Sequence, residues 1–280
     1  MSVTNHTYKF VRSLAMRKYR LQHRCFVAEG PKAVRDLLPL MPCRMLFAED
    51  PFTDEAQRLM QAGAQVDELC LVSHAELERL SSLPAPRGAV AVFHLPEAED
   101  DGVVPPEWTQ LPARELCLAL DGVQDPGNVG TIVRIADWFG IRHIFASRAT
   151  ADVFAPKVVQ ATMGAVGRVK VHYTDLPHWL ANLPQGVPVC GTFLDGNNIY
   201  QHNGRVDHGV LVMGSEGQGI TPEVEACVNA RLLIPNYPAG CATSESLNVA
   251  VATAIVCGEW RRRMEADAVD DGAKKQNWTL

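Results

Sequence analysis

The fold of this chain depends on one stretch near its C-terminal end, Ala242-Thr243-Ser244-Glu245-Ser246-Leu247-Asn248-Val249-Ala250-Val251-Ala252. An apolar run begins at Leu247, and its length predicts a helix that reaches about Met264. Ser244 and Ser246 are both candidate N-caps, because a hydroxyl accepts hydrogen bonds from the free N–H groups of a first helical turn. Those N–H groups also attract ligands. The stretch therefore predicts a capped core helix whose start is a candidate binding site if other polar turns lie beside it.

The bulk composition is that of an ordinary globular protein. Of the 280 residues, 47% are hydrophobic and 21% are charged, which is enough for one large domain or two smaller ones. The formal net charge of −6 excludes a strong basic field over the whole molecule. No apolar run approaches the ~20 residues that a membrane-spanning helix needs, and the N-terminal segment lacks the apolar core of a signal peptide.

The cysteines and histidines indicate a reducing compartment and no metal centre. The 8 cysteines stand singly in apolar patterns, without a CxxC pair, so we interpret them as small buried hydrophobes. The 9 histidines show neither HxxxH nor HExxH spacing, and we expect no metal ligands among them. We therefore expect the protein to be cytoplasmic.

Basic residues are concentrated at the N-terminal end of this acidic chain. Residues 1–35 contain a single acid, Glu29, against eight basic residues, and the pattern predicts one polar helix over residues 7–22. A basic segment on an acidic protein favours a local contact with a polyanion. The candidates for this contact are Arg12, Arg17, Lys18, Arg20 and Arg24. A merely solvated helix face is the alternative.

Alternating strand and helix patterns divide the chain into two α/β domains. Residues 1–96 form the smaller one, which includes a capping box at Ser73–Glu76. An acidic, proline-containing stretch over residues 97–114 is interpreted as a linker. In residues 115–264, continuous apolar strands separated by helices predict a mainly parallel sheet with helices on both faces. Residues 265–280 are expected to form a loose tail.

The first of three polar turns follows an apolar strand and contains Asp125-Pro126-Gly127-Asn128-Val129-Gly130. Asn128 is placed to cap the following helix, and Gly127 and Gly130 let the backbone approach another group closely. Arg134 is expected on the face of that helix opposite the apolar residues, near the strand ends where open α/β sheets bind ligands. A surface salt bridge is the alternative for this arginine. The turn contains neither a GxxxxGK[ST] nor a GxGxxG nucleotide fingerprint.

The second and third turns also follow apolar strands. In Gly214-Ser215-Glu216-Gly217-Gln218-Gly219-Ile220 the glycines predict close backbone approach to a ligand, and Glu216 can accept a hydrogen bond from a hydroxyl or balance a cation. A tight connection with Glu216 in solvent is the alternative. The third turn is Ile234-Pro235-Asn236-Tyr237, which leads to Ser246-Leu247-Asn248. Three such turns in one domain predict a single pocket at the carboxyl edge of the sheet.

Together these residues resemble the SpoU (TrmH-type) RNA 2′-O-methyltransferases of the SPOUT class. The resemblance extends over all three turns and over a fourth segment in which Thr replaces the family's Ser. The matching segments are Asp125–Gly130 with Arg134, Pro156-Lys157…Thr162-Met163-Gly164-Ala165, Gly214–Gly217, and Ile234-Pro235 with Ser246–Val249. Near the N-terminus, Lys18-Tyr19-Arg20 and Phe26–Gly30 are similar to the RNA substrate-binding domain that many members carry.

The resemblance implies a Rossmann-like sheet whose C-terminal segment is threaded into a trefoil knot, and a homodimer packed through the knotted region. It implies S-adenosyl-L-methionine as the cofactor, held by Thr192, Leu194, Gly214, Glu216, Gly219, Ile220, Ile234, Pro235, Ser246 and Leu247. It also implies RNA contacts from the basic N-terminal residues, and a catalytic group made of Arg134, Asn128, Glu216, Ser246 and Asn248.

The implied reaction moves a methyl group to a ribose 2′-hydroxyl of RNA, with ribosomal RNA slightly favoured over transfer RNA. Because a guanidinium keeps its proton up to pH ~12, Arg134 is either a base with strong help from its surroundings or a fork of donors that fixes the ribose or a phosphate. The alternatives are a SPOUT enzyme that methylates a base and a non-catalytic RNA-binding protein of the same fold. The loop Asn236–Ser244 is longer than the family's common form, so the wall of the pocket is expected to differ.

Overall fold

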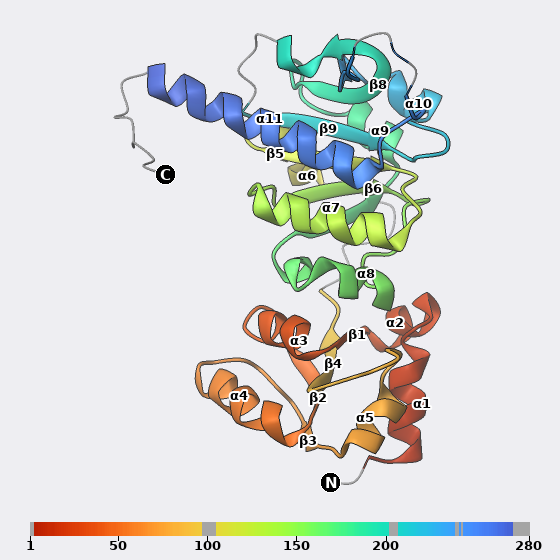
Figure 1. Ribbon diagram of the computed structural model, residues 1–280, viewed down its shortest axis with the longest axis vertical. Coiled ribbons are helices and arrows are strands. Elements are labelled where there is room, and N and C mark those ends of the chain that lie inside the picture. Colours follow the sequence, from red (N-terminus) through yellow and green to blue (C-terminus); the bar gives the residue numbers. More distant parts are fainter. Residues whose placement is uncertain (1–2, 97–104, 202–206, 239–240, 242, 271–280) are drawn as a thin grey trace. The chain divides into compact units, whose positions relative to one another are not determined.

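The computed structural model describes the chain in two compact units. The N-terminal unit contains the chain up to Asp101 together with Asp125–Arg134 and Ala151–Lys170, and the C-terminal unit contains the remainder. The description leaves out side chains beyond residue 264 and the whole of residues 1–2, 97–104, 202–206, 239–240, 242 and 271–280 (Figure 1). Residues 97–104 of the predicted linker and residues 271–280 of the predicted tail therefore lie outside the described residues.

The N-terminal unit is built on a four-stranded sheet in the order β1-β4-β2-β3. Strand β4 runs antiparallel to both β1 and β2, whereas β2 and β3 are parallel. The strands and helices of this part are α1 (Asn5–Ser13), α2 (Arg17–His23), β1 (Cys25–Glu29), α3 (Pro31–Leu37), β2 (Cys43–Ala48), α4 (Asp50–Gln61), β3 (Leu69–Leu71), α5 (His74–Leu80) and β4 (Ala89–His94). The predicted capping box is confirmed, because Ser73 and Glu76 cap each other's backbone N–H groups at the start of α5.

The single helix predicted over residues 7–22 is wrong, because the structure has two helices there. Helix α1 ends at Ser13 and α2 begins at Arg17. The break coincides with a side-chain contact: Nη1 of Arg20 donates to the carbonyls of Leu14 and Ala15, both at 2.8 Å. An arginine that bonds to these carbonyls replaces the backbone N–H groups that a continuous helix would supply.

Residues 151–170 pack inside the N-terminal unit, although the sequence pattern assigns them to the second domain. The segment includes α8 (Pro156–Thr162) and a single 3₁₀ turn. The ring of Phe154 lies 4.8 Å from that of Phe26 on β1, and Gly164, at φ +89°, leaves no room for a Cβ beside the side chain of Asp36. Alternation of strands and helices does not reveal such contacts, because they join residues far apart in the chain.

The C-terminal unit is built on a six-stranded sheet in the order β10-β8-β9-β5-β6-β7. The pairings β10/β8, β8/β9, β9/β5 and β5/β6 are all parallel, which confirms the predicted mainly parallel sheet. Helix α11 packs against β9 and crosses one face of the sheet (Figure 1). The elements are α6 (Pro106–Gln110), β5 (Leu116–Asp121), β6 (His143–Ser147), β7 (Lys170–Thr174), α9 (Leu176–Ala181), β8 (Val189–Asn198), β9 (Gly209–Gly214), α10 (Pro222–Glu225), β10 (Ala230–Leu233) and α11 (Val249–Asp270). Helix α7 (Pro126–Trp138) belongs to the N-terminal unit up to Arg134 and to the C-terminal unit from Ile135.

The end of the predicted linker is part of the core of this unit. Residues 106–113 form α6 and a 3₁₀ turn, and Trp108 is buried with Phe145 and Trp179, whose rings stack at 3.8 Å. The indole N–H of Trp179 donates to the carbonyl of Trp108. The sequence pattern does not predict this helix, because a helix of about one and a half turns is too short to show a hydrophobic period and the segment contains prolines and acids.

Most cysteines are buried and unreactive, as the sequence predicts. Burial raises the pKa of the Cys190 thiol to about 11 and that of Cys257 to about 12, so both stay protonated. Cys227 is partly buried and Cys241 is exposed. Within the described part of the chain, no helix is both long and apolar enough to cross a membrane.

Candidate active site

Five of the cofactor-binding residues predicted on the C-terminal unit lie in or directly after three neighbouring strands. Strands β10, β8 and β9 are adjacent and parallel, so their carboxyl ends lie at one edge of the sheet. Thr192 and Leu194 are in β8, Gly214 ends β9, and Ile234 and Pro235 follow β10. The sheet topology brings these residues toward one edge of the sheet, and the single pocket that the sequence indicates there stays a prediction.

The pairing between β8 and β10 is interrupted at the residues of β8 that include Thr192 and Leu194. Arg231 and Leu232 are consecutive on β10, but they pair with Gly191 and Asn197 of β8, so residues 192–196 bulge out between the two pairs. The side chain of Leu194 is 75% exposed as a result. Bulges of this kind re-aim side chains and are common next to functional sites.

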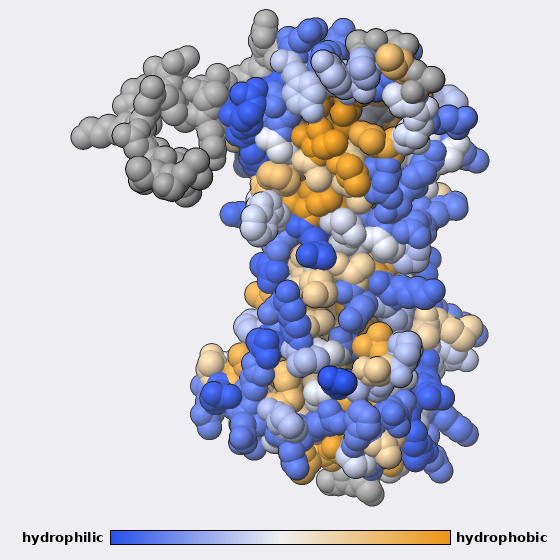
Figure 2. Space-filling model, in the orientation of Figure 1, coloured by the Kyte–Doolittle hydropathy of each residue, from blue (hydrophilic) through white to orange (hydrophobic). Residues whose placement is uncertain are grey.

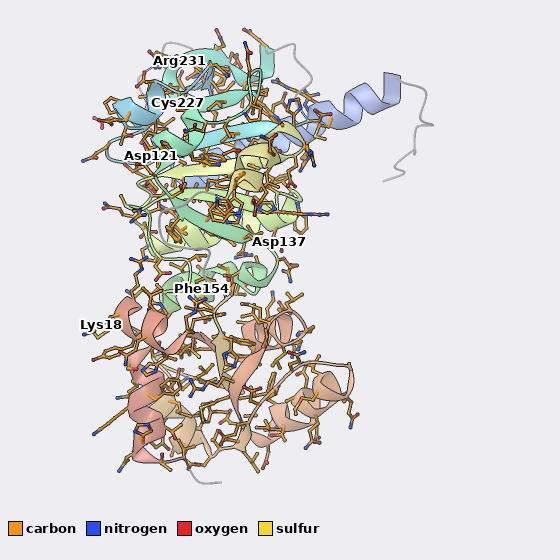
Figure 3. All side chains as sticks on the ribbon, turned by 180° about the vertical axis from the view of Figure 1, so that it is seen from behind. Lys18, Asp121, Asp137, Phe154, Cys227 and Arg231 are labelled. Carbon is orange, nitrogen blue, oxygen red and sulfur yellow. The ribbon has the colours of Figure 1, made fainter. Side chains whose placement is uncertain are left out.

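Arg231 holds this bulge in place, a role that the sequence analysis missed. Its guanidinium carbon lies 3.6 Å from the centre of the Phe193 ring, and its Nη2 donates to Asp195 at 2.5 Å. The remaining Nη1 donates to Glu225 on α10. The guanidinium lowers the pKa of the Asp195 carboxyl. Both partners flank Leu194, so Arg231 fixes the backbone on either side of a predicted cofactor residue (Figure 3).

The glycine-rich turn after β9 closes on itself. The N–H of Ser215 donates to the carbonyl of Gly219 (3.0 Å), and the N–H of Gly219 donates back to Ser215 (2.8 Å). A Cβ on Gly214 would fall closer than 3.0 Å to the backbone of Gly219 and Ile220, and Gly219 itself has φ +70°. The close approach expected at Gly214 is therefore to the returning chain and not to a ligand. Glu216 stands exposed at the tip.

Asp121 clamps the far end of this turn. It is the last residue of β5, it is buried, and its Oδ2 accepts from both the N–H and the hydroxyl of Thr221 at 2.7 Å (Figure 3). Asp121 also pairs with Gly214 in the β5/β9 ladder, so one residue adjoins both ends of the turn. In the sequence its only signal is that it is a carboxylate at the end of an apolar strand, and a buried carboxylate rarely lacks a partner.

The start of α11 differs from the sequence-based expectation. The helix begins at Val249, and its cap is Asn248, whose Oδ1 accepts from the N–H groups of Ala250 (3.0 Å) and Val251 (3.2 Å). Ser244 and Ser246 are thus not the caps, because the helix starts later than predicted. Asn and Ser are equally good caps, and the sequence alone could not rank them. Ser246 and Leu247 precede the helix and are exposed, with 46% of Leu247 accessible.

Helix α7 carries Asn128 and Arg134. It begins at Pro126, and Oδ1 of Asp125 accepts from the N–H of Asn128 at 2.8 Å, so Asp125 and not Asn128 is the cap. A Cβ on Gly130 would fall closer than 3.0 Å to Ala161 on α8, which confirms the predicted close approach and identifies its partner.

Arg134 is exposed, whereas the residues around it on α7 form a buried face. The members of that face are Val129, Ile132, Val133 and Ala136. The predicted orientation of Arg134, away from the apolar side of its helix, is confirmed. Asn128 is partly buried one and a half turns before it.

Arg20, one of the predicted RNA-contacting residues, is buried and engaged within the protein, so it does not belong to an RNA-contacting surface. Its side chain is 4% exposed, and besides its two carbonyl partners it makes a 2.6 Å ion pair with Asp152. A guanidinium committed in this way is structural. Arg12 and Arg24 each donate to a backbone carbonyl, Arg17 lies 3.7 Å from Asp152 at 65% exposure, and Lys18 points into solvent (Figure 3). The helical pattern could not foresee that one basic residue of the set turns inward.

Replacing Arg20 with Met is expected to destabilise the protein by about 3–5 kcal/mol, because Asp152 and two carbonyls would lose their partner in a buried setting. Urea denaturation measures the change. Lys18→Met, on the same helix but exposed, is the control and should alter stability by less than about 0.5 kcal/mol. Equal denaturation midpoints for the two variants would show that Arg20 is not a structural residue.

Comparison with known proteins covers both units. Residues 115–258 match the SpoU rRNA Methylase family, and residues 5–91 match the MRM3-like substrate binding domain. The chain is 28% identical over 258 residues to the 23S rRNA (guanosine(2553)-2′-O)-methyltransferase RlmP of Bacillus subtilis. The aligned region covers 91% of this chain and 96% of that protein. The chain is 30% identical over 247 residues to the 23S rRNA (guanosine-2′-O-)-methyltransferase RlmB of Coxiella burnetii, spanning 85% and 96%.

Solved structures of RNA methyltransferase families are also similar to this chain over most of its length. A protein of the TrmH family from Porphyromonas gingivalis is 45% identical, with a TM-score of 0.78 over 94% of this chain and 100% of that one. The AdoMet-bound rRNA methyltransferase from Sinorhizobium meliloti is 30% identical, with a TM-score of 0.75 over 94% and 97%.

The fold and the turns at its carboxyl edge therefore define an RNA methyltransferase that carries its own substrate-binding domain. More particularly, the chain belongs to the SpoU rRNA methylase family. The family and the α/β fold predicted from the three turns are confirmed.

Proposed function

We propose that this chain transfers a methyl group from S-adenosyl-L-methionine to a ribose 2′-hydroxyl of ribosomal RNA. The observation that carries the proposal is that predicted cofactor residues lie in the bulge of β8 and at the carboxyl ends of the neighbouring strands β9 and β10. Full-length relatives that are named as 23S rRNA 2′-O-methyltransferases support the choice of ribose over base and of ribosomal over transfer RNA.

The residues at this edge fit the proposed cofactor. The side chains of Leu194 and Leu247 are apolar and exposed, and that of Ile234 is partly buried. Exposed apolar side chains suit an adenosine, which has flat apolar faces, and backbone groups of the turns would meet its hydrogen-bonding edges. When bound, S-adenosyl-L-methionine supplies an electrophilic methyl carbon. The bulge at 192–196 and the closed turn at 214–220 would hold it.

Arg134 is proposed to fix the target ribose or its phosphate. A guanidinium stays protonated at neutral pH, so a planar fork of donors is a better description of its task than a base. Glu216, Asn128 and Ser246 are proposed to orient this arginine and the 2′-hydroxyl. Asn248 already uses its Oδ1 to cap α11, and we therefore propose that it positions the helix start.

Helix α11 supports the proposal of a homodimer. One side of the helix is buried in the unit by Val249, Ala250, Thr253, Val256, Cys257 and Trp260. On the other side Val251 is 50% exposed and Ile255 is only partly covered, and hydrophobic residues gather over this helix in Figure 2. The first part of the helix, Val249–Cys257, carries no charged residue, and a helical segment of this kind is normally covered on every side, so a second copy is the proposed cover. The trefoil knot remains a prediction of the resemblance.

Val251→Glu is expected to turn the dimer into a monomer, because a carboxylate would be buried in an apolar contact. Light scattering coupled to gel filtration measures the mass. Leu71→Glu changes an equally exposed leucine, 55% accessible, on the other unit and should leave the mass unchanged. A dimer that persists with Val251→Glu would remove α11 from the proposed interface.

The choice of RNA is tested in cells. Deleting the gene should remove one 2′-O-methyl group from ribosomal RNA, and mapping by mass spectrometry identifies it. Loss of a methylated base would favour the base methyltransferase, and an unchanged pattern with no binding of S-adenosyl-L-methionine would favour the non-catalytic RNA-binding protein.

Buried free thiols fit the cytoplasm that we predict for this reaction.

A further inference from the structure

We propose that a basic cleft between α1 and α5 binds a phosphate of the RNA substrate, an inference that rests on the proposed function. The cleft has a volume of about 310 Å³ and is lined by Asn5, Tyr8, Lys9, Arg12 and Arg79. The first four are spaced i, i+3, i+4 and i+7 on α1, which places them on one face of that helix. Arg79 reaches the same cleft from α5, which packs beside α1.

The cleft concentrates positive charge. Three of its five lining residues are cations and none is an acid. Arg12 donates to the carbonyl of Arg79 (2.9 Å), and Arg79 donates to Asn5 (3.2 Å), so neutral groups hold both guanidinium groups in place. Glu76, one turn before Arg79, has its carboxylate committed to the capping box with Ser73. In the described residues no ion pair within 4.0 Å joins Lys9, Arg12 or Arg79 to a carboxylate, and their charge stays available for an anion.

Tyr8 supplies a second, independent observation. Its side chain is 6% exposed, and Arg79 covers its ring at 3.9 Å. The buried hydroxyl has no hydrogen-bond partner among the residues that the structure describes. A buried donor left without an acceptor is costly, and nearly all such groups in folded proteins are satisfied. Tyr8 lines the cleft but its hydroxyl is buried, so an anion seated there would accept this hydrogen bond once the Arg79 side chain turns from the ring toward the anion.

The chemistry of the lining fits a phosphate of RNA. Guanidinium forks match tetrahedral phosphate oxygens, and hydroxyl groups of Tyr commonly contact the phosphate backbone. A phosphate bound in the cleft would add one anchoring point to the exposed basic residues Arg17 and Lys18 of helix α2. Arg79 lies outside the basic segment of residues 1–35 and is a new member of the proposed RNA-contacting set.

Removing the charges tests the cleft. Arg79→Gln and Lys9→Gln in the full chain should each weaken binding of a fluorescent poly(U) oligonucleotide about 10-fold at low salt. Each should also reduce the slope of log K against log salt by about 0.7, the value for one phosphate contact on a single strand. Arg58→Gln is the matched control, because Arg58 is exposed on α4 of the same unit and donates only to its own helix. Affinity and slope equal to those of the control would overturn the proposal.

Removing the hydroxyl tests the cleft in a different way. Tyr8→Phe should keep or raise the Tm of the free protein, because it deletes an unsatisfied buried group, yet it should weaken poly(U) binding a few-fold. A lower Tm would mean that the hydroxyl bonds within the protein, and it would overturn the assignment, as would unchanged affinity. Binding of polyglutamate at this cleft without an effect on poly(U) would overturn it in favour of an acidic peptide.

The two proposals fail separately. If the wild-type chain methylates ribosomal RNA and the cleft variants bind RNA normally, the cleft proposal alone is wrong. If the wild-type chain binds RNA and the cleft variants lose that binding, but no methyl group is transferred, the cleft proposal holds and the proposed function fails.

Discussion

Arg134→Ala is expected to reduce methyl transfer on the order of 10³-fold while leaving the affinity for S-adenosyl-L-methionine within a few-fold of the wild type. The reason is its place on α7: the side chain is exposed on the face opposite Val129, Ile132 and Val133, so its loss leaves the fold intact. Single-turnover transfer to ribosomal RNA and calorimetry with the cofactor measure the two quantities. Arg142→Ala, an exposed arginine after the same helix, is the control.

Arg134→Lys separates two roles for the positive charge. A lysine keeps the charge but loses the planar fork of donors, so transfer should stay strongly reduced if the fork fixes ribose or phosphate. Recovery of most of the rate would mean that a point charge is sufficient. Near-normal turnover in Arg134→Ala would remove this residue from the catalytic group altogether.

Gly214→Ala is expected to abolish cofactor binding and to lower stability by about 1–3 kcal/mol. A Cβ at this position would overlap the backbone of Gly219 and Ile220, so the turn after β9 could not close. Opening the turn would also pull Thr221 away from its two hydrogen bonds to Asp121. Calorimetry with S-adenosyl-L-methionine and urea denaturation measure the two effects.

Gly217→Ala is the matched control, because nothing lies within 4 Å of a Cβ at that position in the same turn. Its stability should differ from the wild type by less than about 0.5 kcal/mol. If Gly217→Ala also unfolds the turn, the crowding at Gly214 is not the cause. If Gly214→Ala binds the cofactor normally, the closed turn is not part of the cofactor site.

The strands of the parallel sheet could be predicted from the sequence, whereas the residues that cap helices α7 and α11 could not. Strands such as Leu116–Asp121 are apolar throughout because both faces of a parallel sheet are buried, and that pattern is visible in one dimension. A cap depends on which of several equivalent polar residues reaches the first N–H groups. Asp125 instead of Asn128, and Asn248 instead of Ser246, differ by two or three positions within the same motif.

Contacts between distant residues account for the rest of what the sequence could not reveal. Arg20 appears in the sequence as one more basic residue of an exposed helix, yet Asp152, which holds it, is 132 positions away. Asp121 and Thr221 are 100 positions apart, and Arg231 reaches Asp195 across 36. These side chains fix the turns in place, whereas the motif residues supply the surface that the proposed ligands would meet.

The central claim is tested most directly by the chemical position of the transferred methyl group. The chain is incubated with ribosomal RNA and S-adenosyl-L-methionine carrying a tritiated methyl group, and the RNA is then digested with alkali. Methylation of a 2′-hydroxyl removes the group that alkaline cleavage requires, so the label is predicted in alkali-resistant dinucleotides and should be lost with Arg134→Ala. Label recovered only in mononucleotides, or no label in the RNA, would contradict the account.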